Sequence, residues 1–383
     1  MRSRSCLVIG GGVVGLSLAY ELSRVGWTVS IVDRGAVGRE ASWAGAGILP
    51  PANPNSAIHA YEQLRGLSFD LHAEWAERLR SETGIDTGYR RCGGIYLAQT
   101  PGEWASLLGF SSLMTEEGVL VERPPLDELA RLEPELSLQR PAASRQPGTS
   151  STTAIRGGLV LPDECQLRNP WHLQALTTAC RRQGVEILEQ VSIERWTMNG
   201  DHLSELETSQ GKLAADSYCV TAGAWSAHLL ESLGVSLGVV PIRGQMVLLK
   251  TERALVQRII NVGPRYLVPR EDGYLLVGST EEEVGFDKRT TPNVIDDLLH
   301  FAWELVPSLR LARMEKSWSG LRPGVYDGLP YLGQLPGLAN VFIAAGHFRS
   351  GLYLSPGTAV VMAAVMAGEK PCIDIRPFRV NRT

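Results

Sequence analysis

The stretch CLVIGGGVVGLSLAYELSRVGWTVSIVD, residues 6–33, decides the fold of this chain. Its first four residues have the short apolar composition of a β-strand, and the pattern GxGxxG follows at once. Apolar residues then recur at helical spacing as far as Arg24, and a second β-rich run, 27–32, ends at Asp33. A strand, a glycine turn, a helix and a second strand in this order are typical of a nucleotide-binding βαβ unit.

Three glycines and one acidic residue have distinct tasks in such a unit. Gly10 permits the tight turn, Gly12 lets the backbone approach a pyrophosphate, and Gly15 lets the helix pack closely on the strand. The helix that begins at Val13 offers free N–H groups and a positive dipole end to the phosphates. Asp33 follows about 20 residues later, the distance at which an acid accepts hydrogen bonds from ribose hydroxyls. The sequence therefore predicts a dinucleotide site, with a glycine-rich turn of an ordinary α/β sheet as the alternative.

The segment EASWAGAGILP, residues 40–50, favours FAD over NAD as the dinucleotide. Its run of small residues allows the chain to pass close to a bulky cofactor. Ser42 can hydrogen-bond to a phosphate, and the backbone from Gly45 to Gly47 can lie beside a flat ring. A nicotinamide dehydrogenase is expected to continue into another βα repeat at this point instead. A flexible surface loop is the alternative interpretation of the segment.

The composition is that of an ordinary globular protein. Of the 383 residues, 44% are hydrophobic and 20% are charged, and the formal net charge is -4, so nucleic acid and anionic membranes are not expected as partners. The length suits two associated domains. The apolar run 6–18 superficially resembles a signal peptide, but its glycines and the following Glu21 fit the nucleotide-binding turn better. The sequence contains no run of about 18 uninterrupted apolar residues, so it predicts no membrane span.

The cysteines favour free thiols over a disulfide set. They form no CxxC pair, and no histidine lies beside them at the spacing of metal ligands. We therefore expect a cytoplasmic protein in a reducing compartment, without a metal site. The six cysteines lie at positions 6, 92, 165, 180, 219 and 372.

The middle of the chain alternates between helical and strand patterns. Two strands, 266–270 and 275–280, are expected to form a hairpin, because Asp272–Gly273 between them is a strong turn signal. Residues 137–153 are rich in Ser, Thr and Pro and predict a loop or an insertion. Helical spacing predicts four helices, at 59–80, 126–132, 170–183 and 294–306.

The C-terminal part repeats the logic of the first motif. A strand at 340–346 ends in glycine, and the turn His347–Gly351 opens a helix. Such a turn and helix N-terminus can solvate the electron-rich end of a reduced flavin. Arg322 and Arg349 occur in two glycine-rich turns, and an arginine offers a two-pronged fork to a carboxylate. The alternative for each arginine is a surface ion pair.

These motifs resemble those of the FAD-dependent amino-acid oxidases of the D-amino-acid oxidase superfamily, and most of all its glycine oxidase branch of thiamine biosynthesis. The matching runs extend over almost the whole chain in the expected order. They are VIGGGVVGLSLAYEL at 7–21, ASWAGAGILPP at 41–51, TAGAWS at 221–226, PIRGQM at 241–246, YLVPR at 266–270, GLRPGVYDGLPYLG at 320–333 and AAGHFRSGLYLSP at 344–356.

The resemblance implies an α/β fold with two domains. The first is a Rossmann-like FAD-binding domain of the p-hydroxybenzoate hydroxylase type, formed by residues 1–85, 156–229 and 318–383. The second is an α+β substrate-binding domain built on an antiparallel sheet, formed by 86–155 and 230–317. Related sarcosine oxidases bind flavin covalently through a cysteine in the C-terminal third. This chain has none between positions 220 and 371, so noncovalent FAD is expected.

The resemblance also implies which residues form the site. Arg322 becomes the carboxylate clamp, Tyr266 gives a second hydrogen bond to the same carboxylate, and Arg349 lies near the flavin and helps to form the active-site opening. The expected FAD contacts are Gly10, Gly12, Val13, Val14, Gly15, Asp33, Arg34, Ser42, Ala44, Gly45, Ala46, Gly47, Ile48, Val191, Ala222, Gly223, Trp225, Arg322, Gly346, His347, Phe348, Arg349, Ser350, Gly351 and Leu352.

The implied activity is oxidative deamination of glycine, or of another small amine or D-amino acid, with O2 reduced to H2O2. The imine product hydrolyses to a 2-oxo acid and ammonia or is passed on for thiazole synthesis. Alternatives are a D-amino-acid dehydrogenase that passes electrons to a quinone, a sarcosine oxidase-like enzyme, a non-redox flavin-binding module and the oxidase half of a tRNA-modifying enzyme. The expected partners are a small amino-acid substrate and O2, and a homo-oligomer is left open.

Two positions depart from the family pattern. Asp33 stands where the family usually has Glu, so the side chain that reaches the ribose is shorter. Glu281 follows Gly278-Ser-Thr280 at a position that is apolar in the best-known member of the family. If Glu281 faces the substrate, it alters substrate preference; a solvated loop carboxylate is the alternative.

Overall fold

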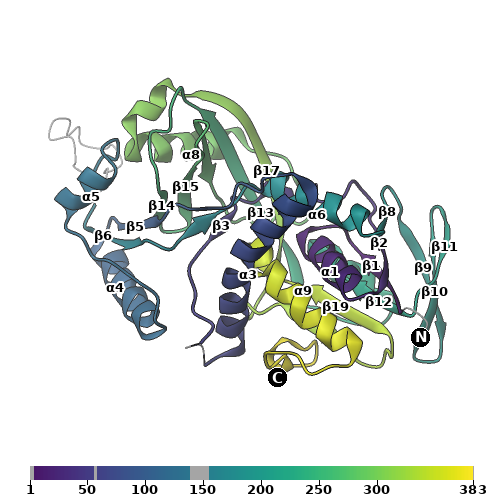
Figure 1. Cartoon of the computed structure of the whole chain (residues 1–383). Helices are drawn as coiled ribbons and strands as arrows, with labels where there is room; N and C mark the ends of the chain where they lie inside the picture. The colour runs from purple at the N-terminus through teal and green to yellow at the C-terminus, as the bar shows by residue number, and fades with distance from the viewer. Residues whose placement is uncertain (1–3, 56–57, 139–154, 383) are drawn as a thin grey trace.

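The computed structural model of the chain describes residues 4–55, 58–138 and 155–382. Two large β-sheets with helices packed against them form the frame of the molecule (Figure 1). The first sheet combines N-terminal and C-terminal strands, and the second is built mainly from the middle of the chain. Each sheet therefore depends on segments that are far apart in the sequence.

The first sheet carries the glycine motif, and its strand order is β18-β19-β12-β1-β2-β8. All neighbouring pairs are parallel except β18–β19 at the edge. Its strands are β1 (Ser5–Ile9), β2 (Thr28–Val32), β8 (Glu186–Leu188), β12 (Ser217–Val220), β18 (Tyr331–Gln334) and β19 (Val341–Ala345). In sheets of this kind ligands bind outside the carboxyl ends of the parallel strands.

Helices cover one face of this sheet and bury most of the core. Helix α1 packs against α9 and α6, and α3 packs against α9 and α6 in turn. Tyr20 of α1 meets Trp75 of α3 edge to face, with 5.2 Å between ring centroids. Both side chains are fully buried and belong to one apolar cluster with β1 and β2. The helices are α1 (Val13–Arg24), α3 (Ala60–Thr83), α6 (Asn169–Arg182) and α9 (Gly351–Ala367).

The second sheet is mainly antiparallel, and its strand order is β17-β13-β16-β15-β14-β5-β6. Only β14 and β5 pair in parallel. Its strands are β5 (Gly94–Ala98), β6 (Gly157–Leu161), β13 (Val239–Lys250), β14 (Ile259–Val262), β15 (Arg265–Pro269), β16 (Tyr274–Gly278) and β17 (Arg313–Val325). The amphipathic helix α8 (Pro292–Leu305) and the helices α4 (Pro101–Glu116) and α5 (Leu126–Leu132) pack against it.

Two small sheets complete the fold. One is a hairpin-like extension at the far edge of the first sheet, and the other ties the segment after α2 to the strand before α6 (Figure 1). The remaining strands and α-helices of the described residues are β9 (Ile193–Asn199), β10 (His202–Thr208), β11 (Gly211–Leu213), β3 (Ile48–Leu49), β4 (Arg90–Arg91), β7 (Cys165–Gln166), α2 (Ala41–Ala44) and α7 (Ser226–Glu231).

The α/β fold class predicted from the sequence is confirmed, as are the four helices of the middle segment within a few residues. The hairpin is present as β15 and β16, with Gly273 at a φ of 78° in the turn. The predicted loop 137–153 lies almost wholly outside the described residues. The two-domain division remains a proposal. It assigns β6 and the part of β17 from residue 318 onward to the FAD-binding domain, whereas both are strands of the second sheet.

One helix, Phe348–Ala367, is long and apolar enough to cross a membrane by composition alone. It includes α9, which lies between α1 and α3 and contributes many buried side chains to the core. This packing accounts for its apolar character. The six cysteines are all free, and four of them are buried.

Gly15 provides a test of the close contact between α1 and β1. A Cβ at this position would overlap the Gly10 carbonyl oxygen and stand 2.6 Å from Thr221 Oγ1. Because the Gly10 contact is with backbone, we expect Gly15→Ala to lower the free energy of unfolding by about 1–3 kcal/mol. Denaturant unfolding of the purified protein measures this. Gly102→Ala, also in a helix but with nothing within 4 Å of its Cβ, is the matched control and should keep or slightly raise the free energy of unfolding, since alanine favours helix.

Candidate active site

A cavity of about 1030 Å³ runs between the two large sheets. It is lined by the glycine turn of the first sheet at one side and by β13, β14, β15 and β17 of the second sheet at the other. Its volume stands at the upper end of the range for ligand and cofactor sites. The cavity contacts every predicted FAD residue except Gly15, and it also contacts Tyr266.

The glycine turn forms one end of the cavity. Gly10 has a φ of 111°, and a Cβ there would stand 2.7 Å from the Thr221 carbonyl oxygen. Asp33 accepts hydrogen bonds from the N–H groups of Gly11 (2.7 Å) and Gly35 (2.8 Å). A carboxylate has about four acceptor positions, so it keeps capacity for ligand hydroxyls. Burial raises the pKa of Asp33 despite these two backbone hydrogen bonds.

The small-residue segment 41–48 is held firmly beside this turn. Ser42 Oγ accepts a hydrogen bond from Val13 N–H at 2.9 Å, and its carbonyl accepts one from Asn169 at 2.7 Å. The Trp318 indole donates to the Ala44 carbonyl at 3.1 Å, and a Cβ on Gly320 would stand 2.5 Å from that of Ala44. The segment is therefore packed against β17 and is not a free surface loop.

At the end of the cavity beyond Asp33, an arginine stacks on a tryptophan ring. The Arg34 guanidinium lies 4.0 Å from the centre of the Trp225 ring, and both residues line the cavity with Val191. Such a flat cationic and aromatic pair can stack on a nucleotide base. This position, beyond Asp33, suits the adenine end of a dinucleotide.

The C-terminal turn closes the cavity from the first sheet. Gly346 has a φ of 81°, and Phe348, a non-glycine residue, has a φ of 47°. His347 is buried, with Nε2 3.1 Å from Thr358 Oγ1, and burial lowers its pKa to about 4. It is therefore neutral at physiological pH. Helix α9 begins next, at Gly351, so its positive dipole end lies beside the cavity.

Arg322 points into the cavity from β17. Its guanidinium donates to the Thr280 carbonyl (2.9 Å) and to Ser279 Oγ (2.7 Å). A Cβ at Gly244, on the neighbouring strand β13, would overlap this guanidinium, so glycine is what leaves it room. Burial lowers the pKa of Arg322, yet a guanidinium starts high enough to remain charged. An arginine has five N–H donors, so donors remain for a ligand.

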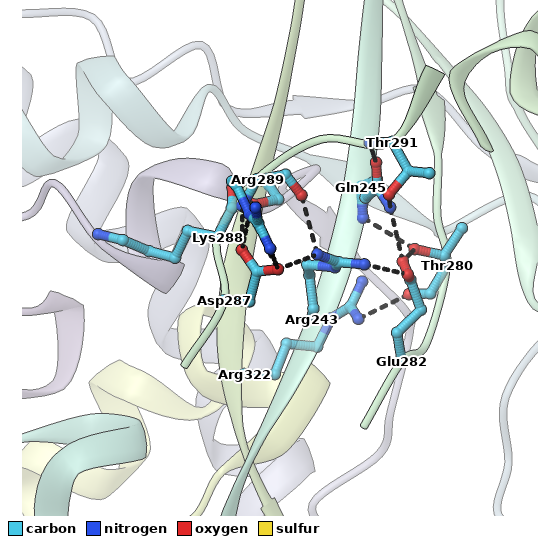
Figure 2. A network of polar contacts seen from close by, with 10 residues as sticks. Arg243, Gln245, Thr280, Glu282, Asp287, Lys288, Arg289, Thr291 and Arg322 are labelled. Carbon is cyan, nitrogen blue, oxygen red and sulfur yellow. Dashed lines mark hydrogen bonds and ion pairs between the residues drawn. The ribbon is translucent and has the colours of Figure 1, made fainter. Parts of the chain in front are cut away.

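A polar network behind Arg322 fixes the loop that holds it (Figure 2). Glu282 lies at its centre and accepts hydrogen bonds from Arg243 (2.6 Å), Gln245 (2.9 Å) and Thr280 (2.5 Å). Arg243 is almost fully buried, and its other guanidinium nitrogen faces Asp287 at 3.5 Å. Partial burial alone would raise the pKa of Glu282. The hydrogen bonds together outweigh this effect, so its pKa lies below the ordinary value. The loop is thereby anchored to β13.

Tyr266 lies near Arg322 on β15. Its hydroxyl donates to Met246 Sδ at 3.3 Å, and thioether sulfur is a weak acceptor. Gly278 on β16 leaves space for the ring, because a Cβ there would stand 2.8 Å from Tyr266 Cε2. The hydroxyl can therefore turn from sulfur to a stronger acceptor in the cavity.

Arg349 lines the mouth of the cavity and is partly exposed. Its guanidinium is 2.6 Å from a carboxylate oxygen of Glu281 and donates to the Pro264 carbonyl at 3.2 Å. Glu281 thus bridges the loop after β16 to the C-terminal turn. It is exposed and does not line the cavity, so of the two alternatives the structure favours the loop carboxylate, here paired with an arginine.

Sequence reasoning missed a polar group of cavity residues around the substrate side. No local motif marks them, because they come from two helices and two strands that only the fold brings together. They are Tyr61, Arg65, Tyr96, Asn261 and Tyr353.

The family model of the FAD dependent oxidoreductases, named DAO, matches residues 5–365 of the chain. The chain belongs to this family. FAD is therefore its cofactor, and the cavity fits it: the glycines leave space for a phosphate, Val13 begins a helix, and Asp33 retains acceptor capacity. Gly15 serves the packing of α1 and does not line the cavity.

Individual relatives of this FAD-dependent oxidoreductase are similar to it in sequence or structure over almost its whole length. The glycine oxidase of Pseudomonas aeruginosa is 34% identical over 98% of each chain. The bifunctional protein ThiO/ThiG of Synechocystis is 32% identical over 98% of this chain and 53% of its own length. The crystal structure of glycine oxidase from Geobacillus kaustophilus covers 100% of both chains with a TM-score of 0.91 and 31% identity.

Glu282 provides a test of the network behind Arg322. We expect Glu282→Gln to raise the dissociation constant of acetate about tenfold, equal to ~1.4 kcal/mol, because the loop that orients the Arg322 guanidinium loosens. The change in flavin absorbance on acetate addition measures the affinity. Glu283→Gln, an exposed neighbour, is the control and should bind acetate as the wild type does. Unchanged affinity in Glu282→Gln would contradict the positioning role.

Proposed function

We propose that this oxidoreductase is a glycine oxidase that serves thiamine synthesis. It oxidises glycine, or another small amino acid or amine, to the imine, which hydrolyses to the 2-oxo acid and ammonia, while O2 is reduced to H2O2. The observation that carries the proposal is the position of Arg322 and Tyr266 in the wall of the cavity that also contains the glycine turn. The glycine oxidase and ThiO/ThiG relatives support it.

Bound FAD supplies the two-electron acceptor for the Cα hydride and the route of the electrons to O2. The chain itself holds the substrate. Arg322 offers its remaining N–H donors as a fork to the carboxylate, and the Tyr266 hydroxyl gives a second hydrogen bond to the same group. With the carboxylate fixed, Cα is confined to one position in the cavity, and such positioning supplies a large share of the rate.

The wider setting follows from the same proposal. The substrate is a small molecule, and the enzyme acts in the cytoplasm. The described residues that line the cavity include no cysteine. FAD therefore binds without a covalent link to a thiol. The ring end of the cavity is lined by the small residues Ala44 to Gly47 on one side and the C-terminal turn on the other.

The proposal is tested with the yellow holoenzyme under anaerobic conditions. We expect glycine to bleach the flavin absorbance and to yield H2O2 when air is admitted. Sarcosine, D-alanine and D-proline serve as competing substrates in the same assay and rank the specificity of the cavity. No flavin reduction by any of the four would sink the oxidase assignment.

Arg322→Ala tests the carboxylate clamp separately. Loss of a partly buried charge-assisted pair costs about 2–5 kcal/mol, so acetate affinity should fall at least about 30-fold. The flavin absorbance change on acetate addition again gives the dissociation constant. FAD content, measured by the absorbance ratio of flavin to protein, reports whether the variant still folds around its cofactor. An unaltered acetate affinity in a flavin-loaded Arg322→Ala variant means that the clamp lies elsewhere.

A further inference from the structure

A row of polar side chains crosses the second sheet beside the clamp. Asn261 on β14 pairs directly with Tyr266 on β15 and with Tyr96 on β5. Directly paired residues project from the same face of a sheet, so the three side chains are neighbours. All three line the cavity. The clamp tyrosine is thus the first member of a row that leads away from Arg322.

A buried carboxyl group stands at the end of this row. Glu164, from the turn between β6 and β7, is fully buried, and its Oε1 accepts a hydrogen bond from the Tyr96 hydroxyl at 3.2 Å. A Cβ at Gly94 would overlap its Oε2, so glycine at position 94 makes room for the carboxyl group. Tyr96 and Asn261, the two side chains that lower the pKa of this carboxyl group by hydrogen bonding, both line the cavity.

Two polar atoms of this group have no good partner. Glu164 Oε2 and Asn261 Nδ2 are both fully buried, and neither makes a hydrogen bond of good geometry within the described part of the chain. Asn261 is nevertheless close enough to act on the Glu164 carboxyl. Buried polar groups are nearly always satisfied, and an exception calls for a functional explanation. Glu164 Oε2 therefore keeps acceptor capacity on the same carboxyl group that receives the Tyr96 hydrogen bond.

The proposed reaction leaves one proton without an acceptor. Free glycine at neutral pH carries an ammonium group, whereas hydride loss from Cα requires the neutral amine. We propose that Glu164, acting through Tyr96, accepts the proton that the substrate ammonium group must lose. The inference rests on the proposed function and adds to it the amine side of the substrate site.

The transfer balances within the row. The substrate N–H bond breaks as an O–H bond forms at Tyr96 Oη, while the original hydroxyl proton of Tyr96 passes to Glu164 Oε1. Asn261, between Tyr96 and the clamp, offers its side-chain oxygen to the amine and fixes its direction. The proton returns through Tyr96 to the cavity after the product has left.

Two carboxylates whose arginine partners line the cavity are less suited to accept it. Glu62 is paired with Arg65 at 2.5 Å, and Glu281 is paired with Arg349 at 2.6 Å. A carboxylate that already faces a cation is a weaker base. Glu164 has no ion-pair partner among the described residues, and burial raises its pKa to about 8. An arriving ammonium group favours its ionised form, because opposite charges attract strongly away from water.

The groups around Glu164 determine how its titration is read. Tyr96 and Asn261 face the carboxyl group, and the thiols of Cys92 and Cys165 lie close to it. Arg65 and Tyr353 act on Tyr96 from the helices packed against it. Burial raises the pKa of both thiols, so the carboxyl titrates before them. A base must be deprotonated to act, so kcat/KM should rise with pH and reach half its limit near pH 8.

Glu164→Gln is the sharpest test, because glutamine keeps the size and the contact with Gly94. In the wild type we expect kcat/KM for glycine to follow the carboxyl titration. In the variant it should fall about 100-fold at pH 7, the usual contribution of a general base, and its inflexion should move up to the pKa of the free substrate amine. Tyr96→Phe, which removes only the hydroxyl link, should shift the profile in the same direction.

Two controls separate this role from damage to the site. Acetate has no amine, so its affinity should be equal in wild type and Glu164→Gln. Glu133→Gln removes another buried carboxyl group, one that accepts from Gln257 and Arg258 and does not line the cavity, and should leave the pH profile unchanged. A carboxylic acid infrared band that disappears through pH 8 in the wild type, and is absent in Glu164→Gln, gives a readout independent of turnover.

The outcomes are distinguishable. If glycine does not reduce the wild-type flavin, the proposed function fails and the proton acceptor fails with it. If glycine reduces the wild type and Glu164→Gln keeps the wild-type pH profile, only the role of Glu164 is overturned. That role is overturned as well if acetate affinity in Glu164→Gln falls as far as kcat/KM, because the substitution has then disturbed the clamp.

Discussion

The contact between Gly15 and the Gly10 carbonyl is the constraint on which the site depends. It brings the start of α1 against the end of β1, and Thr221 Oγ1 at the end of β12 donates to the same carbonyl at 2.7 Å. The end of β1, the start of α1 and the end of β12 thus all contact the Gly10 carbonyl. Any side chain at Gly15 would separate them and shift the helix N-terminus. Because these backbones approach closely, the glycine turn lies close to the carboxyl ends of the first sheet and leaves the cavity in front of it open.

The second constraint is β17, the edge strand of the second sheet, which contacts the small-residue segment beside this space. It pairs with β13 along its whole length, and its glycine at position 320 allows the small-residue segment to lie against it. Two residues further on, Arg322 projects into the cavity. The arginine costs free energy to bury, and the loop after β16 offsets this with a carbonyl and a hydroxyl acceptor. The Arg243–Glu282 pair then holds that loop, so the position of the clamp is set several residues away from it.

The sequence predicted the first half of this arrangement and not the second, for a physical reason. The glycine turn, α1 and Asp33 follow each other in the chain, so their spacing alone carries the information. The hairpin around Gly273 is local in the same sense. The glycine-rich surroundings made Arg322 one of two candidate arginines, but its choice as the clamp and its pairing with Tyr266 came only through the family resemblance, because β17 and β15 are not adjacent in the sheet. Pairing between distant strands leaves no period in the sequence that could be read.

The register of the second sheet explains why the row beside the clamp escaped detection. Tyr96 and Asn261 meet because β5 and β14, separated by more than a hundred residues of chain, pair in parallel within an otherwise antiparallel sheet. A shift of one residue in that pairing would turn Asn261 to the opposite face and leave the Tyr96 hydroxyl facing an apolar neighbour. Glu164 would then keep its bond to Tyr96 but lose the contact with Asn261. The chemistry of the amine side is therefore a property of strand register, just as that of the phosphate side is a property of glycine spacing.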